Sequence, residues 1–421
     1  MTERPTTDSP LPAATGNAPL ASVDETIAAA LGLCTPVNGT DTVQIKDAVG
    51  RVTAYDVVSL FSLPLRDHSA VDGYAMAGHG RGPFRIVGNV IAGDAVPERL
   101  AQGEALRIMT GAPIPAGTES VVMQEHVEVA DGAVSPTFDV PPGDNIRRKG
   151  EDVSSMDVLV KAGTRLDPRH VAVLAASGYQ GIEVRRRLKV ALLSTGNELR
   201  DPGVGMGQGS IFDTNRPMLS ALLSEENLEI TDLGIRPDNR DIIADTLAKA
   251  AETHDMIITS GGVSVGVEDH LRPAVVQAGG KIQNWRMAIK PGKPITIGNL
   301  GQAIYLGLPG NPLACFVDFL LVGRPVLSAL CGRPYLASAP SNATAGFHLT
   351  RRPGRREFFP ASVVGLSESG LPVIEKIGRA GSARLMPLIE ADGLGVIDSD
   401  CETVEPGAAL QFFPFRSELV I

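Results

Sequence analysis

The regular alternation of apolar runs with helical stretches between Leu188 and Leu330 constrains the fold most strongly. The runs LKVALLS, LEITDLG, DMIITS and QAIYLGL are typical of strands. Residues 216–226, 241–253, 269–278 and 312–330 are expected to form helices between and after them. Strands that alternate with helices of this length predict a parallel sheet covered on both faces. We therefore expect a central α/β domain over residues 188–333.

The segments on either side of this domain have a different pattern. Residues 1–20 show no periodicity and are expected to be a flexible tail. Ser22 and Glu25 predict a capped helix that begins the folded part. Short apolar runs broken by Gly and Pro then predict a β-rich region up to about Leu188, interrupted by a helix over 168–177. Residues 334–421 return to short strands and predict a small all-β domain.

Charge and hydropathy narrow the classes of protein to which the chain can belong. Lys and Arg number 38 against 48 Asp and Glu, and the net charge of −10 argues against a nucleic-acid partner. The most apolar stretch, from Leu313 to Leu330, contains Asp318 and Arg324, so a buried helix is expected rather than a membrane span. The four cysteines form no C-x-x-C pair and fit a reduced, cytoplasmic compartment, and no secretory signal is recognised.

Three glycine-bearing loops directly follow predicted strands. They are Ser194-Thr195-Gly196-Asn197-Glu198, Ser260-Gly261-Gly262-Val263-Ser264 and Leu308-Pro309-Gly310-Asn311-Pro312. In an open α/β sheet, ligands bind beyond the carboxyl ends of the strands, so the loops should meet at one edge. Each loop alone fits an ordinary turn between a strand and a helix. Together they favour an anionic ligand, because glycine backbone N–H groups and hydroxyls bind phosphate-like groups.

The segment Lys290-Pro291-Gly292-Lys293-Pro294 is a local basic site in an acidic chain. The prolines stiffen it and hold two ammonium groups close together. A solvated loop is the alternative interpretation. We prefer an anion site, because an anion between the two lysines would relieve their mutual repulsion.

Acidic residues cluster in a second set of turns. Asp67 and Asp72 flank the turn DHSAVD, and Asp152 follows the mixed-charge run RRKGE. Carboxylates beside a phosphate site require a bridging cation, and Mg²⁺ prefers oxygen ligands. A turn-stabilising role is favoured for Asp67, whereas Asp72 is the better candidate for the site.

Taken together, these segments resemble the molybdopterin molybdenumtransferase family, which includes MoeA and the gephyrin E domain. The matching stretches are DHSAVDGYA, RIMTGAPIPAG, DNIRRKGED, VALLSTGNEL, IFDTNR, TSGGVSVG, AIKPGKP, LPGNP and GRREF. The resemblance implies a multidomain fold of α/β plus all-β type. It combines a central parallel α/β (MogA-like) domain over 188–333, a β-rich domain over 54–152, an elongated linking domain over 21–53 and 153–187, and a C-terminal β-barrel-like domain over 334–421.

The resemblance also implies an activity, a cation and partners. The substrate would be adenylylated molybdopterin, into which molybdate is inserted with release of AMP and assistance from Mg²⁺. A homodimer is implied, with molybdopterin adenylyltransferase as a partner enzyme, in the cytoplasm and without nucleic acid or membrane.

Site residues transfer from the family motif by motif. The catalytic set is Asp72, Thr110, Asp152, Glu198, Asp238 and Asp269, of which Asp72, Asp269 and Glu198 would be metal ligands. The substrate-binding set is Ser260, Gly261, Gly262, Ser264, Lys290, Lys293, Pro309, Gly310, Asn311, Pro312 and Arg356.

Three motifs depart from the family pattern. Asn197 stands where relatives often have Asp, His270 replaces a Tyr after Asp269, and only Asp238 remains of an acidic pair. These departures leave open a pterin-binding carrier or scaffold without insertion activity. A nucleotide-binding oxidoreductase ranks last, because no G-x-G-x-x-G opens a first βαβ unit.

Overall fold

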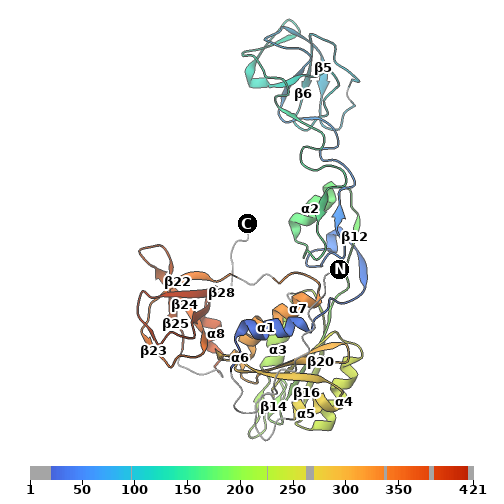
Figure 1. Ribbon diagram of the computed structural model, residues 1–421. Coiled ribbons are helices and arrows are strands. Elements are labelled where there is room, and N and C mark those ends of the chain that lie inside the picture. The colour runs from blue at the N-terminus through green and yellow to red at the C-terminus, as the bar shows by residue number, and fades with distance from the viewer. Residues whose placement is uncertain are drawn as a thin grey trace, which may run out of the picture. The chain divides into compact units, whose positions relative to one another are not determined.

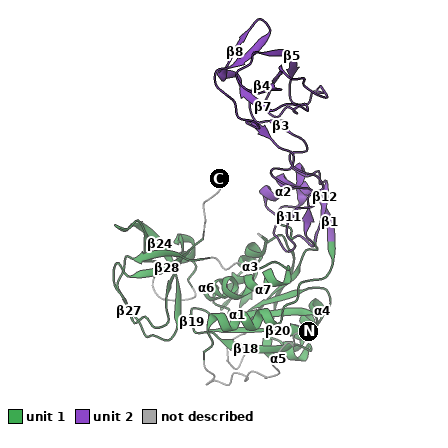
Figure 2. Cartoon of the chain, turned by 45° about the horizontal axis from the view of Figure 1, so that its top comes forward, with its two compact units in different colours: residues 1–40, 50–52, 185–421 green, residues 41–49, 53–184 purple. Residues whose placement is uncertain are grey.

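The chain folds into two compact units, which Figure 2 distinguishes by colour. The computed structural model describes residues 20–95, 97–224, 226–261, 270–335, 339–378 and 384–415, so the predicted tail lies almost wholly outside the described ranges. Unit 1 comprises residues 1–40, 50–52 and 185–421, and unit 2 comprises residues 41–49 and 53–184. Unit 2 is therefore an insertion in the chain of unit 1.

Unit 1 contains a six-stranded sheet (Figure 1). Its spatial order is β16 (Glu229–Arg236), β13 (Lys189–Thr195), β17 (Met256–Ser260), β21 (Ala303–Leu308), β20 (Pro294–Leu300) and β18 (Lys281–Arg286). The first four strands are parallel, as the alternation predicts. β20 pairs antiparallel with β21, and β18 pairs antiparallel with β20. The sequence pattern does not predict these two pairings. The sheet is mixed because a two-residue turn with Gly301 in the left-handed region folds β20 back onto β21.

Helices cover both faces of this sheet, as predicted. One face packs against α1 (Val23–Gly32), α3 (Asn215–Ser224), α6 (Pro312–Asp318), the π-helical turn η3 (Phe319–Gly323) and α7 (Arg324–Leu330). The other face packs against α4 (Arg240–Ala251) and α5 (Leu271–Gln277). The predicted capping box at the start of α1 is present, with Ser22 and Glu25 each accepting the other's backbone N–H.

The apolar stretch Pro312–Leu330 is long enough to cross a membrane by length and composition alone. In this fold 72% of its most apolar window is buried, against the sheet and α1. Its place in the core agrees with the expectation of a buried helix.

The C-terminal part of unit 1 is a closed barrel. Its strands are β24 (Arg356–Leu366), β25 (Pro372–Lys376), β22 (Ser341–Ala345), β28 (Ala409–Pro414) and β26 (Gly393–Ile397), and a β24–β26 pairing closes the ring. The short strand β19 (Ile289–Lys290) pairs in parallel with β24. This pairing joins the α/β domain to the barrel and fixes which of their residues face one another.

Unit 2 is β-rich, as predicted. Its largest sheet runs in the order β7 (Ser120–Met123), β4 (Gly73–Met76), β6 (Glu104–Ile108), β5 (Phe84–Val90), β9 (Ala133–Pro136) and β8 (Val127–Ala130). Another buried cluster gathers α2 (Pro168–Ala176), β1 (Thr40–Gln44), β12 (Gly181–Arg185), β2 (Val57–Val58) and β11 (Val158–Val160). The finer division into a linking domain and a β-rich domain stays a prediction.

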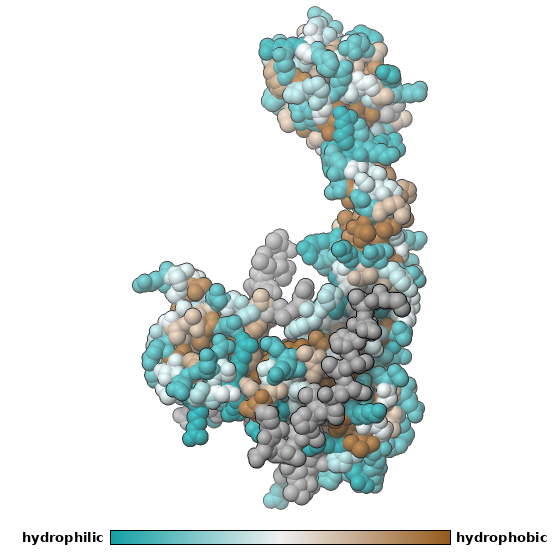
Figure 3. Space-filling model, in the orientation of Figure 1, coloured by the Kyte–Doolittle hydropathy of each residue, from teal (hydrophilic) through white to brown (hydrophobic). Residues whose placement is uncertain are grey.

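Several large apolar side chains of unit 2 remain exposed. They are Tyr55, Leu60, Phe61, Met156 and Val158, each about half exposed or more. Figure 3 shows hydrophobic surface over the part of unit 2 that carries α2. Exposed apolar patches of this kind commonly mark contacts with other proteins.

Candidate functional site

Most of the site residues predicted in unit 1 line one cleft of about 1430 Å³. The cleft lies at the carboxyl ends of β13, β17 and β21, where the three glycine loops were expected to meet, and β24 and β25 of the barrel also contribute to its wall. The predicted residues that line it are Glu198, Asp238, Ser260, Gly261, Lys290, Lys293, Pro309, Gly310, Asn311 and Pro312. Gly262, Ser264 and Asp269 lie outside the described residues.

Close backbone packing holds the first two loops together. Gly261 has a φ of +101°, and a Cβ there would lie 2.8 Å from the carbonyl oxygen of Thr195. Only glycine fits both the conformation and the space. The loops after β13 and β17 therefore approach more closely than any larger residue would permit.

Asn215 connects the second and third loops. Its side-chain amide donates to Ser260 Oγ at 2.9 Å and to the Gly310 carbonyl oxygen at 2.8 Å. Asn215 is itself 4% exposed and begins α3. Asn215 belongs to the motif IFDTNR, but the motif predicts no role for it, because its partners are distant in the chain.

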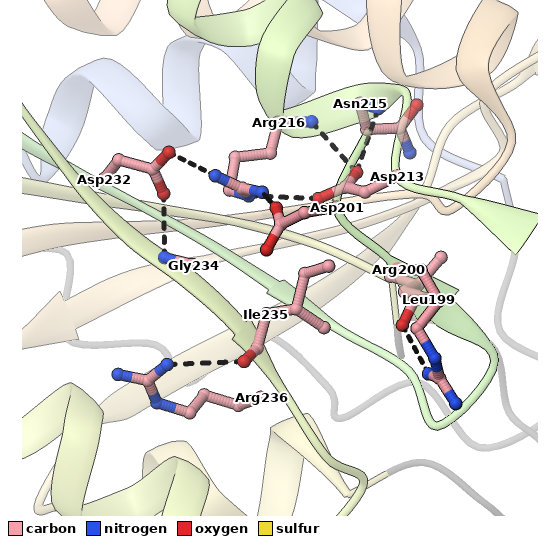
Figure 4. Close-up of polar contacts among 10 residues, drawn as sticks. All are labelled: Leu199, Arg200, Asp201, Asp213, Asn215, Arg216, Asp232, Gly234, Ile235 and Arg236. Atoms are coloured by element: carbon pink, nitrogen blue, oxygen red, sulfur yellow. Dashed lines mark hydrogen bonds and ion pairs between the residues drawn. The ribbon is translucent and has the colours of Figure 1, made fainter. Parts of the chain in front are cut away.

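Arg216 anchors the start of α3 through a group of carboxylates (Figure 4). Its guanidinium contacts the carboxylates of Asp213, Asp201 and Asp232. Asp213 also accepts the backbone N–H groups of Asn215 and Arg216, both at 3.2 Å. Burial opposes the charge of Arg216, but the three carboxylates outweigh it and raise the pKa of the guanidinium. This network fixes the position of Asn215 and so of the loops it binds.

Three buried polar atoms at the end of β13 and the start of α3 have no hydrogen-bond partner among the described residues. They are Ser194 Oγ, Thr195 Oγ1 and Asn215 Oδ1. A buried polar group without a partner costs free energy. Of the three residues, Thr195 and Asn215 also line the cleft, whereas Ser194 does not.

The basic wall of the cleft is built by the pairing of β19 with β24. Lys290 lies opposite Glu357 in the register, and their side chains form an ion pair at 3.2 Å. Burial lowers the pKa of Lys293, and the nearby charges of Arg286 and Arg355 lower it further. The sequence predicts an anion here because two lysines repel each other. In the structure Lys290 is paired with the carboxylate of Glu357, and the repulsion acts instead between Lys293 and the two arginines Arg286 and Arg355.

The structure separates the two arginines of the GRREF motif. Arg355 lines the cleft, whereas Arg356, the predicted residue, is not among the lining side chains. Arg356 hydrogen-bonds Gln411 and lies 3.4 Å from Asp398. Of the two arginines, Arg355 is therefore the one that lines the cleft, and a role of Arg356 in ligand binding stays a prediction.

The acidic side of the cleft is organised by Asn197. Its backbone N–H donates to the carboxylate of Asp238 at 3.1 Å, and its side-chain oxygen accepts the Asp238 N–H at the same distance. Asn197 thus orients Asp238 beside Glu198, which also lines the cleft. Within the described ranges, no three His, Cys, Asp or Glu side chains form a metal-binding group. Glu198 and Asp238 nevertheless supply the carboxylate oxygens that Mg²⁺ prefers.

Unit 2 carries the remaining predicted residues. Asp72 Oδ1 accepts the backbone N–H and the hydroxyl of Thr110, both at 2.7 Å. These hydrogen bonds from Thr110 lower the pKa of Asp72, which is ionised throughout the neutral range. No side-chain hydrogen bond joins Asp152 to this pair in the described part of unit 2, whereas Asp67 is bound by Arg148 and Lys149 as a turn residue.

Comparison with known proteins gives consistent matches along the chain. Family models match for the MoeA N-terminal region (domain I and II) over residues 21–178, a probable molybdopterin binding domain over 191–329 and the MoeA C-terminal region (domain IV) over 342–415. A molybdopterin molybdenumtransferase of Haemophilus influenzae is 35% identical over 90% of this chain and 94% of its own length. One from Staphylococcus aureus is 32% identical over 69% of this chain and 71% of its own.

A solved structure has the same fold. The molybdopterin biosynthesis MoeA protein from Pyrococcus horikoshii OT3 superposes with a TM-score of 0.79 and 28% sequence identity. The match covers 94% of this chain and all of that protein. The similarity therefore extends over nearly the whole chain rather than one domain.

Proposed function

The chain belongs to the molybdopterin molybdenumtransferase family, and on that premise we propose that it inserts molybdate into adenylylated molybdopterin and releases AMP. The family resemblance inferred from the motifs is thereby confirmed, as are the fold class and a transferase role in molybdenum cofactor biosynthesis. The substrate form, the cation and the residue roles belong to the proposal.

The charge of the cleft is the observation that carries the proposal. Among its described lining residues, six are cationic (Arg200, Lys290, Lys293, Arg355, Lys376 and Arg384) and four are anionic (Glu198, Asp213, Asp238 and Glu357). The chain as a whole has a net charge of −10. A locally cationic cleft in an acidic protein is suited to an anionic substrate, because both molybdate and the phosphoanhydride of an adenylylated phosphate are anions.

The basic wall would bind and orient the oxyanion. Lys290, Lys293 and Arg355 present charged N–H donors, which form stronger hydrogen bonds to oxyanions than neutral donors do. No covalent nucleophile of the protein is required, because the dithiolene sulfurs would displace molybdate oxygens, which leave as water. A molybdate oxygen or a water molecule would attack the phosphoanhydride, and AMP would leave. The protein supplies orientation and charge stabilisation instead.

The acidic side would hold a divalent cation. Glu198 and Asp238 are the candidate oxygen ligands in the cleft. Mg²⁺ bound there would supply Lewis-acid stabilisation of negative charge on the phosphoryl group that leaves with AMP. Asp72 of unit 2 is proposed as a further carboxylate required for turnover, held ionised by Thr110.

A reconstituted reaction tests this function. Purified chain is mixed with adenylylated molybdopterin, molybdate and varied Mg²⁺, and AMP and pterin-bound molybdenum are measured. We expect both products to appear together and in equal amounts, with a requirement for Mg²⁺. Tight binding of the pterin without AMP release would instead support the carrier or scaffold, which the names of the relatives do not favour.

We also propose a cytoplasmic homodimer that receives its substrate from molybdopterin adenylyltransferase. The exposed apolar side chains of unit 2, including Tyr55, Phe61 and Met156, are a candidate contact surface. Sedimentation velocity of the purified chain should give the mass of a dimer. Co-elution with the adenylyltransferase would support the handover, and a monomer over the whole concentration range would contradict the dimer.

A further inference from the structure

Glu357 is a buried carboxylate at the centre of a cationic group in the cleft wall. It is 3% exposed. Lys376 Nζ lies 2.6 Å from Oε1, and Lys290 Nζ lies 3.2 Å from either oxygen. Arg351 Nε lies 3.7 Å from Oε2. One carboxylate therefore contacts three cationic side chains, which leaves positive charge in excess.

Three strands bring these side chains together. Glu357 belongs to β24, Lys290 lies opposite it on β19, and Lys376 is the last residue of β25. Figure 2 labels both β19 and β24. Lys376 Nζ lies 5.3 Å from the centroid of the Phe359 ring, within cation–π range. Glu357 and Phe359 thus fix the ammonium group of Lys376 rather than leave it mobile.

The group faces the cleft. Lys290, Lys376 and Glu357 all line the cleft, and the side chains of Lys290 and Lys376 are 43% and 19% exposed. Burial opposes ionisation of Glu357, but the charges of Lys376 and Lys290 outweigh it and lower the pKa of the carboxyl. A single lysine would neutralise this carboxylate. The second ammonium group is surplus to internal pairing and is available to an anion.

We propose that Lys376 is an oxyanion-binding residue of the cleft and that Glu357 is the positioning residue that holds Lys376 and Lys290 side by side. The inference rests on the proposed function for the identity of the ligand. The chemistry recognised is a tetrahedral oxyanion, either molybdate or the phosphate of the adenylylated substrate. Through Lys376, the barrel would then bind the ligand directly in addition to lining the cleft.

Binding measurements test Lys376 without requiring turnover. The Lys376→Met variant keeps an unbranched side chain at this position and removes the charge. Molybdate and AMP are titrated separately into the full-length chain by calorimetry. We expect at least one dissociation constant to rise roughly tenfold, as for the loss of one charge-assisted hydrogen bond. The matched control is Lys281→Met, an exposed lysine that is not among the lining residues and should bind both anions as the unmodified chain does.

The separate titrations distinguish the two sources of oxyanion. Weaker binding of molybdate alone would place Lys376 at the metal oxyanion, and weaker binding of AMP alone would place it at the phosphate. Unchanged affinity for both anions would overturn the proposal. Lys376→Arg should retain affinity for the anion, because it keeps a positive charge next to Glu357. If Lys376→Arg binds the anion as weakly as Lys376→Met does, the proposed charge contact is wrong.

Glu357→Gln tests the positioning role. It should weaken binding of the same anion as Lys376→Met does, and a circular-dichroism melt of Glu357→Gln shows whether that variant is folded. If Glu357→Gln is folded and binds both anions normally, the positioning role is refuted. A chain that binds molybdate through Lys376 but releases no AMP from adenylylated molybdopterin would refute the proposed function and leave this inference standing.

Discussion

Arg355 and Arg356 are adjacent in the sequence but have different surroundings. Arg355 immediately precedes β24 and lines the cleft, whereas Arg356 is the first residue of β24 and does not. The motif predicts an arginine at the site, but the sequence alone does not show which of the two lines the cleft. The same limit applies to Asn215, whose partners Ser260 and Gly310 are far apart in the chain. Residue types were predictable from motifs, whereas their orientation required the fold.

Asp72 is expected to be essential for turnover. Asp72→Asn removes the charge while keeping a side-chain oxygen that can accept from Thr110, so the turn should survive. The rate of AMP release should fall by about a hundredfold or more, which is the effect typical of removing one group that stabilises charge in a transition state. Chromatographic assay of AMP and a circular-dichroism melt check both points. Asp139→Asn, an exposed change in the same unit, is the control, and a large drop in melting temperature for Asp72→Asn would show a structural role.

Lys293 is expected to contribute to molybdate affinity. The pKa of its ammonium group is already lowered by burial and by Arg286 and Arg355, and a bound anion would relieve that repulsion. Lys293→Ala should raise the apparent KM for molybdate roughly tenfold with less effect on kcat. Initial rates at varied molybdate measure the change, and an unaltered KM would remove Lys293 from the site.

At the scale of elements, the predicted helices and parallel strands formed because their periodicity is local and strong. The β20–β18 addition and the β19–β24 pairing were not predicted, because short strands that pair with distant segments leave little pattern in the sequence. The motifs also do not predict which residues stabilise the start of α3. Asp201, Asp213 and Asp232 come from three separate segments and meet only around Arg216.

Removal of Arg216 should therefore damage the start of α3. Arg216→Met leaves the buried carboxylate of Asp213 without its cationic partner, and the free energy of unfolding should fall by about 3 kcal/mol. Urea titration measures this loss, with Arg240→Met as the exposed control. Equal stability of the two variants would mean that the network does not stabilise the fold.

Asp318 of α6 gives the stability a pH dependence. Its carboxyl is fully buried, neither oxygen has a partner among the described residues, and it packs against Gly292 of the basic segment so closely that a Cβ there would overlap it. Burial raises the pKa of Asp318 well above 3.8. The folded state therefore holds this proton when the unfolded state has lost it, so stability is lost as pH rises above 3.8.

Asp318→Asn should remove that component. The variant should lose less stability than the unmodified chain between mildly acidic and mildly alkaline pH, because it has no carboxyl to titrate at this position. Denaturant titrations at several pH values measure the two slopes. Asp400→Asn, an exposed change in the barrel, should leave the slope as it is. Identical slopes for the unmodified chain and Asp318→Asn would contradict burial of an ionisable group there.

At the scale of the whole molecule, the order of α/β and β-rich regions was predictable from the sequence, but the two-unit division was not. Sequence patterns show where a region begins and ends, whereas compact units depend on which regions share a core. The first 40 residues belong with residues 185–421 because Ala30 of α1 packs in the same buried cluster as Leu327 and Leu330 of α7.

Unfolding should occur in two transitions, since each unit has buried clusters of its own. The single tryptophan, Trp285, lies on β18 of unit 1 and reports only on that unit. Its fluorescence and the far-ultraviolet circular dichroism should therefore give different midpoints in denaturant. Superimposable curves from the two probes would show that the units unfold together.

The packing of α1 on α7 also has a consequence for synthesis on the ribosome. About 300 residues separate these helices, which at roughly 5–20 residues per second corresponds to about 15–60 s of translation. Throughout that interval α1 emerges without the surface that buries its apolar side. The inserted unit 2 is fully synthesised before α7 is, and it can fold while α1 still lacks its packing partner. Newly made chains are thus most exposed to aggregation and to chaperone capture before Leu330 has left the exit tunnel.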